Sequence, residues 1–352
     1  MQFKAVFRVL GILLTCFSFS MLVPVGVSFY LHDAHIYPYI IAFAVTICTG
    51  LILWLPLFHD RSELKIRDGF LIVILFWVVL SAFSALPFIF AFHHDMGFTN
   101  SVFESVSGFT TTGVSAFGDL RQMSATMLYY RQQLQFLGGM GIIVLAVAIL
   151  PMLGVGGMQL YRAETPGPMK DDKITPRIAE TAKAIWAVYV GLVIACTLSY
   201  WLAGMSVLEA LETAFGTIST GGFSTHNTSF IYFHSNLMDI VGIVFMFLGG
   251  TNFTLHYLAA TRASFKPYWK DVEFRNYLGA AIVVSIIIIV LLALFHVYHS
   301  VWGDAVQAVF NIVSIMTTTG FVSSNFTIWP LFIPFLLMIL GLIGACGGST
   351  SG

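Results

Sequence analysis

Three short stretches of the chain place hydroxyl side chains directly before a glycine. They occupy residues 110–113, 219–222 and 317–320, and read Thr-Thr-Thr-Gly, Ser-Thr-Gly-Gly and Thr-Thr-Thr-Gly. Their last glycines, Gly113, Gly222 and Gly320, are 109 and 98 residues apart. The flanking sequence repeats as well, because Phe-Leu-Gly-Gly occurs at 136–139 and again at 247–250. A repeat of this length indicates copies of one structural unit.

Coordination of a monovalent cation is the chemistry that suits these stretches. A dehydrated alkali cation needs several neutral oxygens, and potassium channels supply them from backbone carbonyls. Thr and Ser add hydroxyls, while glycine permits the backbone conformation that turns successive carbonyls toward one axis. The stretches contain no carboxylate, which argues against divalent ions because these favour charged oxygen ligands. One Thr-Thr-Gly would indicate only a loop, but three matching copies favour an ion filter.

The composition predicts an all-α polytopic membrane protein. Of 352 residues, 58% are hydrophobic and only 9% are charged, whereas soluble domains carry about 25% charged residues. This excludes an ordinary soluble enzyme and a disordered chain. The net charge of −1 excludes the basic surface of a nucleic-acid-binding protein. The four cysteines lie apart in apolar stretches, without metal-ligand spacing.

Eight apolar stretches are long enough to cross a membrane. They are about 7–31, 37–58, 69–92, 134–156, 184–205, 237–261, 277–299 and 329–346. With a cytoplasmic N-terminus, 14 of the 16 Lys and Arg residues fall on the inside and only Arg121 and Arg131 on the outside. The positive-inside rule therefore favours this orientation.

Three partly apolar segments, 100–114, 206–223 and 304–321, each follow an outward helix and are too short to span. Irregular backbone at membrane depth requires surrounding protein or a water-filled path, so we expect re-entrant hairpins. Ser101 to Glu104, Ser206 to Glu209 and Asp304 to Gln307 have capping-box spacing or resemble it. Each short helix would then end at a hydroxyl stretch, with its partly negative terminus toward a cation. Glu104 and Glu209 are interpreted as caps that do not touch the ion.

Several motifs resemble the bacterial Trk/Ktr potassium-transporter superfamily, in particular the TrkH/TrkG type of membrane subunit. They are residues 110–113, 218–226 and 344–350, together with the cytosolic segments 158–168 and 176–182. The resemblance covers the whole chain and implies two leading helices and repeated helix–pore loop–helix units around one pathway. The implied parts are leading helices 1–68, a first unit 69–160, a cytosolic loop 161–183, a second unit 184–262, a loop 263–276 and a third unit 277–352.

The resemblance also implies the site residues. K⁺ would be held by the main-chain carbonyls of Thr111, Thr112, Thr220, Gly221, Thr318 and Thr319. Support would come from Thr110, Gly113, Ser219, Gly222, Thr317 and Gly320. A gate loop beneath the filter would correspond to Gly344, Ala345, Cys346, Gly347, Gly348 and Ser349.

The function implied is potassium uptake across the bacterial inner membrane, by a homodimer gated by a cytosolic TrkA-type nucleotide-binding ring. Because the family has a fourth unit and this chain stops at Gly352, we expect a lone copy not to conduct. Two alternatives stay open: a non-conducting copy that only assembles with pore or ring subunits, and a sodium-coupled symporter. An intramembrane enzyme is disfavoured because no paired nucleophile and base occur at membrane depth. For His256, pore lining and an interhelical hydrogen bond are equally compatible with the sequence.

Overall fold

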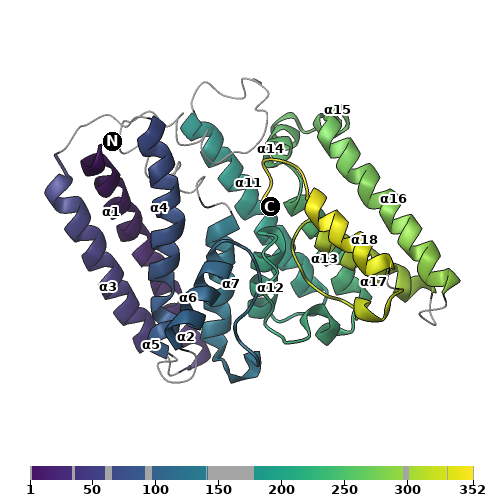
Figure 1. Cartoon of the computed structure of the whole chain (residues 1–352), viewed down its shortest axis with the longest axis horizontal. Coiled ribbons are helices and arrows are strands. Elements are labelled where there is room, and N and C mark those ends of the chain that lie inside the picture. The colour runs from purple at the N-terminus through teal and green to yellow at the C-terminus, as the bar shows by residue number, and fades with distance from the viewer. Residues whose placement is uncertain are drawn as a thin grey trace. The chain divides into compact units, whose positions relative to one another are not determined.

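The computed structural model describes residues 2–33, 36–59, 66–91, 97–139, 141, 178–295, 301–330 and 332–351. Within these ranges every regular element is a helix (Figure 1). The chain divides into two compact units, Met1–Trp186 and Ala187–Gly352. The fold expected from composition, an all-helical polytopic architecture, is confirmed.

In the described part of the chain, the first unit contains three long helical spans followed by shorter helices. Its elements are α1 (Phe3–Ser20), α2 (Leu22–Leu31), α3 (Tyr37–Trp54), η1 (Leu55–Leu57), α4 (Ile66–Ser84), α5 (Leu86–Ala91), α6 (Gly97–Phe109), η2 (Leu120–Gln122) and α7 (Ala125–Gly139). The short helix α6 ends directly before the first hydroxyl stretch.

The second unit repeats the alternation of long and short helices. After α11 (Ile178–Leu202), which begins before the division, come α12 (Val207–Ile218), η3 (Ser229–Phe233), α13 (Asn236–Gly249), α14 (Phe253–Arg262), α15 (Lys266–Lys270), α16 (Val272–Leu294), α17 (Val301–Met316), η4 (Phe326–Ile328) and α18 (Phe332–Ile343). The short helices α12 and α17 each end directly before a hydroxyl stretch.

Five helical segments among the described residues are long and apolar enough to cross a membrane. They are Phe3–Leu31, Tyr37–Leu57, Arg67–Ala91, Lys183–Leu202 and Val272–Leu294. On α16 the exposed side chains are themselves apolar, including Ile282, Val283, Ile286 and Val290. A helix that exposes apolar side chains on most of its surface is suited to lipid rather than to water.

Three of the eight expected spans differ from the prediction or extend beyond the description. The predicted span 237–261 is wrong as one helix, because α13 and α14 meet at 96°. Asn252 caps α14 by accepting a hydrogen bond from the Thr254 N–H at 2.8 Å, so a new helix starts there. The span expected at 329–346 is reduced to the 12-residue α18. Most of the span expected at 134–156 lies outside the described residues.

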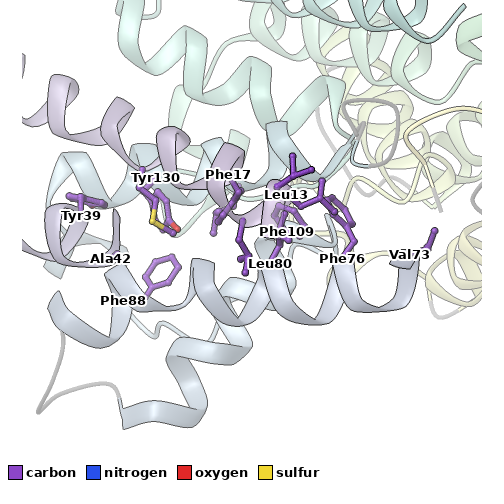
Figure 2. Close-up of a cluster of buried hydrophobic side chains, with 14 of the residues drawn as sticks. Leu13, Phe17, Tyr39, Ala42, Val73, Phe76, Leu80, Phe88, Phe109 and Tyr130 are labelled. Carbon is purple, nitrogen blue, oxygen red and sulfur yellow. The ribbon is translucent and has the colours of Figure 1, made fainter. Parts of the chain in front are cut away.

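The core of the first unit surrounds the end of α6. Figure 2 shows Phe109 within a cluster that includes Leu13, Phe17, Phe76 and Leu80. The Phe109 ring centroid lies 5.8 Å from that of Phe17 and 5.6 Å from that of Phe76. Each such aromatic pair contributes about 0.5–1.5 kcal/mol. The last residue before the first hydroxyl stretch is therefore fixed by packing.

In the second unit the residues that match Phe109 are also buried. Ile218 ends α12 and Met316 ends α17, and their exposed fractions are 0% and 2%. Met316 belongs to a cluster formed by α16, α17 and α18. All three hydroxyl stretches thus begin from an apolar residue anchored in the interior.

Candidate ion filter and gate

The three hydroxyl stretches adopt the same left-handed turn. The second residue of each has a positive φ: 55° at Thr111, 51° at Thr220 and 55° at Thr318. The glycine two residues later is also left-handed, with φ of 78° at Gly113, 76° at Gly222 and 82° at Gly320. Among the described residues, these threonines are the only β-branched ones with positive φ. Such strain at matching positions is typical of functional sites.

Each turn closes its short helix with the same hydrogen bonds. In the first copy the Thr111 N–H donates to the Gly108 carbonyl at 3.1 Å, and the Thr112 N–H donates to the Ser107 carbonyl at 2.8 Å. The other copies repeat this pattern with Thr220 to Thr217 (3.2 Å), Gly221 to Gly216 (2.9 Å), Thr318 to Ile315 (3.0 Å) and Thr319 to Ser314 (2.8 Å). This is the Schellman arrangement, here with threonine at the position that glycine usually holds.

The pattern leaves the carbonyls of the turns available. Because the amides donate back into their own helices, the described turns have carbonyl oxygens but no free amide donors near the helix end. In the described part of the chain, no hydrogen bond ends on the carbonyls of Thr111, Thr112, Thr220, Gly221 or Thr319. The partly negative C-terminal end of each helix lies at the same place. The arrangement therefore presents neutral oxygen ligands to a cation.

Within the second unit, the second and third turns lie directly against each other. A Cβ atom added to Gly222 would be 1.7 Å from the Thr319 carbonyl oxygen. A further backbone contact is the 3.2 Å hydrogen bond from the Ile231 N–H to the Val322 carbonyl. This contact between the two turn segments brings together four of the predicted filter residues: Thr220, Gly221, Thr318 and Thr319. The first turn belongs to the other unit.

Glycines from the following helix pack behind two of the turns. A Cβ on Gly138 would lie 1.8 Å from the Phe109 carbonyl oxygen, and one on Gly249 would lie 2.9 Å from that of Ile218. These glycines occupy matching places in the repeated Phe-Leu-Gly-Gly sequence. The repeat therefore preserves a close approach of two backbones, which only glycine allows.

The expected gate loop follows α18 and fills the break between α13 and α14. The Cys346 N–H donates to the Gly250 carbonyl at 3.0 Å, and the Phe253 N–H donates to that of Gly348 at 3.1 Å. The Gly347 N–H donates to the Glu273 carboxylate at 2.7 Å. Gly344 and Gly348 have φ of 71° and 76°, Ala345 lies beside Gly250, and the Ser349 hydroxyl donates to the Cys346 carbonyl.

Two hydroxyls beyond the predicted gate residues connect this loop to the turns. The Thr350 hydroxyl lies 2.7 Å from the Ile218 carbonyl and 3.0 Å from that of Gly249. The Ser351 hydroxyl donates to the Thr317 carbonyl at 2.7 Å and lies 3.1 Å from the Thr318 hydroxyl. The loop therefore lies directly beneath the second and third turns. The sequence analysis included Thr350 in the motif 344–350, but it predicted no contact between these hydroxyls and the turns.

The interpretation of both glutamates as simple helix caps is wrong for Glu104. Its carboxylate is fully buried and lies 2.6 Å from Nε of Arg131, because α7 crosses behind α6 at this point. At Glu209 the expected cap is present, since its N–H donates to the Ser206 hydroxyl at 3.3 Å. The Glu209 side chain, however, lies 2.6 Å from Nε2 of His226. The helix starts expected at Ser101 and Asp304 are wrong, because α6 begins at Gly97 and α17 at Val301, so both residues lie inside their helices. The Asp304 side chain lies outside the described part of the structure.

His256 is held by hydrogen bonds on both ring nitrogens. Nε2 lies 2.9 Å from the Leu248 carbonyl, and Nδ1 lies 2.6 Å from the Tyr268 hydroxyl. Its exposed fraction is 6%. Of the two roles compatible with the sequence, the structure favours the hydrogen-bonding one, in which His256 connects α14 to the end of α13 and to α15.

Comparison with known proteins agrees with this geometry. The TrkH family model, described as a cation transport protein, matches residues 35–352. The chain belongs to the TrkH family. This is a family of transporters rather than of enzymes.

Individual TrkH relatives match over the whole chain. The Trk system potassium uptake protein TrkH of Vibrio parahaemolyticus is 47% identical over 354 residues, covering 100% of this chain and 73% of the relative. TrkH of Escherichia coli K12 is 46% identical over 352 residues, with the same coverage. The crystal structure of the potassium transporter TrkH from V. parahaemolyticus superposes with a TM-score of 0.88 and 44% identity, over 100% of this chain and 72% of that one. The polytopic transporter fold is therefore shared.

Proposed function

We propose that this chain is a pore-forming subunit for potassium uptake across the bacterial inner membrane. Membership of a cation transport family and the names of its relatives support this function. The observation that carries it is the triplicated turn, in which strained threonines and glycines leave carbonyl oxygens unpaired at a helix end. A cation that enters such a site exchanges water for carbonyl ligands at little net cost.

The filter ligands in this proposal are the carbonyls of Thr111, Thr112, Thr220, Gly221, Thr318 and Thr319. The residues that shape the filter are Thr110, Gly113, Ser219, Gly222, Thr317 and Gly320. Thr317 supports the assignment because its hydroxyl donates to the Val313 carbonyl at 2.7 Å and lies 2.8 Å from the Thr319 hydroxyl. The first copy has the same pair, since the Thr110 and Thr112 hydroxyls are 2.8 Å apart.

The gate in this proposal is the loop that contains Gly344, Ala345, Cys346, Gly347, Gly348 and Ser349. Its position under two of the turns supports this role, because an ion leaving them toward the cytoplasm would meet Thr350 and Ser351. Opening would require the loop to leave the break between α13 and α14. Loops with several glycines can make such changes because glycine restricts the backbone least.

Assembly and orientation belong to the same proposal. The relatives' names describe parts of a Trk system, which supports a cooperating subunit; we assign it as a TrkA-type nucleotide-binding ring beneath a homodimer. The N-terminus is cytoplasmic, as the distribution of Lys and Arg indicates. The functional alternatives, a sodium-coupled symporter and a non-conducting assembly partner, are outcomes of the test below.

Growth and Rb⁺ uptake in cells without other potassium uptake systems test the function. The full-length protein, expressed from its complete gene, should restore growth at low K⁺. Gly222→Ala should abolish selective uptake because its Cβ would meet the Thr319 carbonyl. Gly320→Ala, which has open space but φ of 82°, should cost about 1–2 kcal/mol and reduce K⁺ over Na⁺ selectivity about tenfold.

Gly279→Ala is the matched control, because this glycine lies in α16 and a Cβ there meets nothing within 4 Å. It should transport as the wild type does. Absence of K⁺ rescue would favour the non-conducting partner, and Rb⁺ uptake that requires Na⁺ would favour the symporter. Unchanged selectivity in both filter variants would reject the filter assignment.

A further inference from the structure

One position in the short helices carries a buried polar side chain in all three copies, and in two of them this side chain bonds to the segment that follows the turn. Glu104, Thr213 and Asn311 each lie nine residues before the glycine of their own turn. Glu104 and Asn311 have exposed fractions of 0%, and Thr213 of 6%. Buried polar side chains require partners, and the partners of two of these residues lie just beyond the turn.

Glu104 holds the first post-turn segment through its carboxylate. One oxygen accepts the Ala116 N–H at 2.7 Å, and the other lies 2.6 Å from Nε of Arg131. The Ser115 hydroxyl lies 3.1 Å from both carboxylate oxygens and also 3.1 Å from Nη2 of Arg131. The buried ion pair therefore fixes residues 115 and 116, two and three positions after Gly113.

In the third copy Asn311, which is uncharged, holds the segment that follows the turn. Its Nδ2 donates to the Ser324 hydroxyl at 2.9 Å, and its Oδ1 accepts the Ser323 N–H at 3.4 Å. These serines lie three and four positions after Gly320. The same helix position thus holds the same part of the loop with an amide in place of an ion pair.

The second copy uses the neighbouring turn of its helix. Glu209 lies four residues before Thr213, hence on the same helix face, and its carboxylate is 2.6 Å from Nε2 of His226. His226 follows Gly222 by four positions and stacks on Tyr232 with ring centroids 3.5 Å apart. The side chains of this pair are 24% and 26% exposed. The segment after each turn is therefore held by a different interaction: an ion pair in the first copy, a glutamate–histidine contact in the second and an amide in the third.

We propose that Glu104, held by Arg131, is a positioning residue that fixes the far end of the 111–113 turn and thereby sets discrimination among monovalent cations. The inference rests on the proposed function. Carbonyl ligands are neutral, so their number and placement decide which cation they suit. The near end of the turn is fixed by the Schellman hydrogen bonds, and the far end by the Glu104 carboxylate.

The ion pair suits this role because it combines strong bonds with no net charge. Charge-assisted hydrogen bonds are shorter and roughly twice as strong as neutral ones. A lone buried carboxylate would add its own attraction for cations, and a lone guanidinium would repel them. Paired within 2.6 Å, the two hold the backbone in place while their fields largely cancel.

The test measures Rb⁺ uptake in competition with Na⁺, at equal amounts of protein in the membrane. Ser115→Ala removes one bridging hydroxyl without a change in charge and should lower K⁺ over Na⁺ discrimination about threefold. Glu104→Gln should lower it about tenfold and also slow uptake, since an amide then replaces the charged partner of the Ala116 N–H and of Arg131 Nε. Asp119→Asn is the control: it makes the same carboxylate-to-amide change in the same outer segment, where Asp119 bonds to the exposed Arg121.

Reduced discrimination in Ser115→Ala and Glu104→Gln, with wild-type discrimination in Asp119→Asn, supports the positioning role. Wild-type discrimination in both variants, even with less protein in the membrane, overturns it, because Glu104 then serves folding alone. If Glu104→Gln does not accumulate, Ser115→Ala decides. If the wild type itself does not discriminate, the proposed function fails instead, and the two failures are distinguished by this measurement.

Discussion

Thr111, Thr220 and Thr318 hold a backbone conformation that glycine would adopt more easily. A residue with a Cβ pays about 1–2 kcal/mol in the left-handed region, and the chain carries this cost three times. Two of the three hydroxyls have a partner below them: Thr318 lies 3.1 Å from Ser351, and Thr220 lies 3.4 Å from Thr350. At these two positions the threonine hydroxyl connects the turn to the loop beneath, which glycine could not do.

The glycines behind the turns give a graded prediction at the residue scale. Gly138→Ala should destabilise the protein by about 3 kcal/mol, because its Cβ would lie 1.8 Å from the Phe109 carbonyl and only backbone movement relieves that overlap. Gly249→Ala should cost less, about 1 kcal/mol, since the distance to the Ile218 carbonyl is 2.9 Å. Thermal unfolding in detergent should therefore give a lower unfolding temperature for Gly138→Ala than for Gly249→Ala.

Gly191→Ala serves as the reference, because a Cβ on this glycine of α11 meets nothing within 4 Å. Replacing glycine by alanine within a helix should stabilise it by about 0.5–1 kcal/mol. Equal unfolding temperatures for the variants at 138 and 191 would contradict the close approach of α7 to the end of α6.

At the scale of elements, the break between α13 and α14 and the loop after α18 form one structure. The loop contributes the amides of Cys346 and Thr350, which donate to the carbonyls of Gly250 and Gly249 at 3.0 and 3.3 Å. The break also leaves the carbonyls of Gly249 and Gly250 without the hydrogen bonds that a continuous helix would have made to them. A broken helix is therefore required to receive the loop, and movement of either element must disturb the other.

Removal of the hydroxyls beneath the turns should favour an open loop. In Thr350→Val, the carbonyls of Ile218 and Gly249 lose their hydroxyl donor, which destabilises the closed arrangement by about 1 kcal/mol. That energy corresponds to about fivefold more open loop. We expect Rb⁺ leak from Thr350→Val to rise by about this factor, and leak from Ser351→Ala to rise similarly. Both are measured in liposomes without a nucleotide-binding partner.

Thr327→Val is the comparison variant, since the Thr327 hydroxyl bonds only within its own outer turn, 2.6 Å from Oδ1 of Asn325. Its leak should equal that of the wild type. If Thr350→Val and Ser351→Ala leak no more than this variant, the loop after α18 is not a barrier to ions.

The short helices and their turns were predictable because they depend on local sequence. A hydroxyl stretch and a glycine after an apolar helix end specify the turn wherever they occur. The break at residues 250–252 was missed because hydropathy averaged over a long window hides a polar pair. Its local signals were present, namely the glycines before it and Asn252 as a helix cap. The pairing of Glu104 with Arg131 was not predictable, since 27 residues and a change of helix separate them.

For the whole molecule, the asymmetry of basic residues predicts which ends of the helices face the cytoplasm. Arg121, 84% exposed in the loop after the first turn, belongs outside, and the exposed Lys270 of α15 belongs inside. In a variant without native cysteines, Arg121→Cys should react with an impermeant maleimide in intact cells, whereas Lys270→Cys should react only after permeabilisation. The reverse labelling would invert the proposed topology.

In the part of the chain that the structure describes, the backbone amides of each turn donate only to carbonyls of the helix that precedes it. The conformation of such a hairpin depends on its own local sequence. A duplicated segment would therefore form the same turn, with the same carbonyl ligands. The surroundings of each duplicate could then diverge independently. The turn backbone is the same in all three copies, while the side chains around it differ: a salt bridge in the first, an imidazole in the second and an amide in the third.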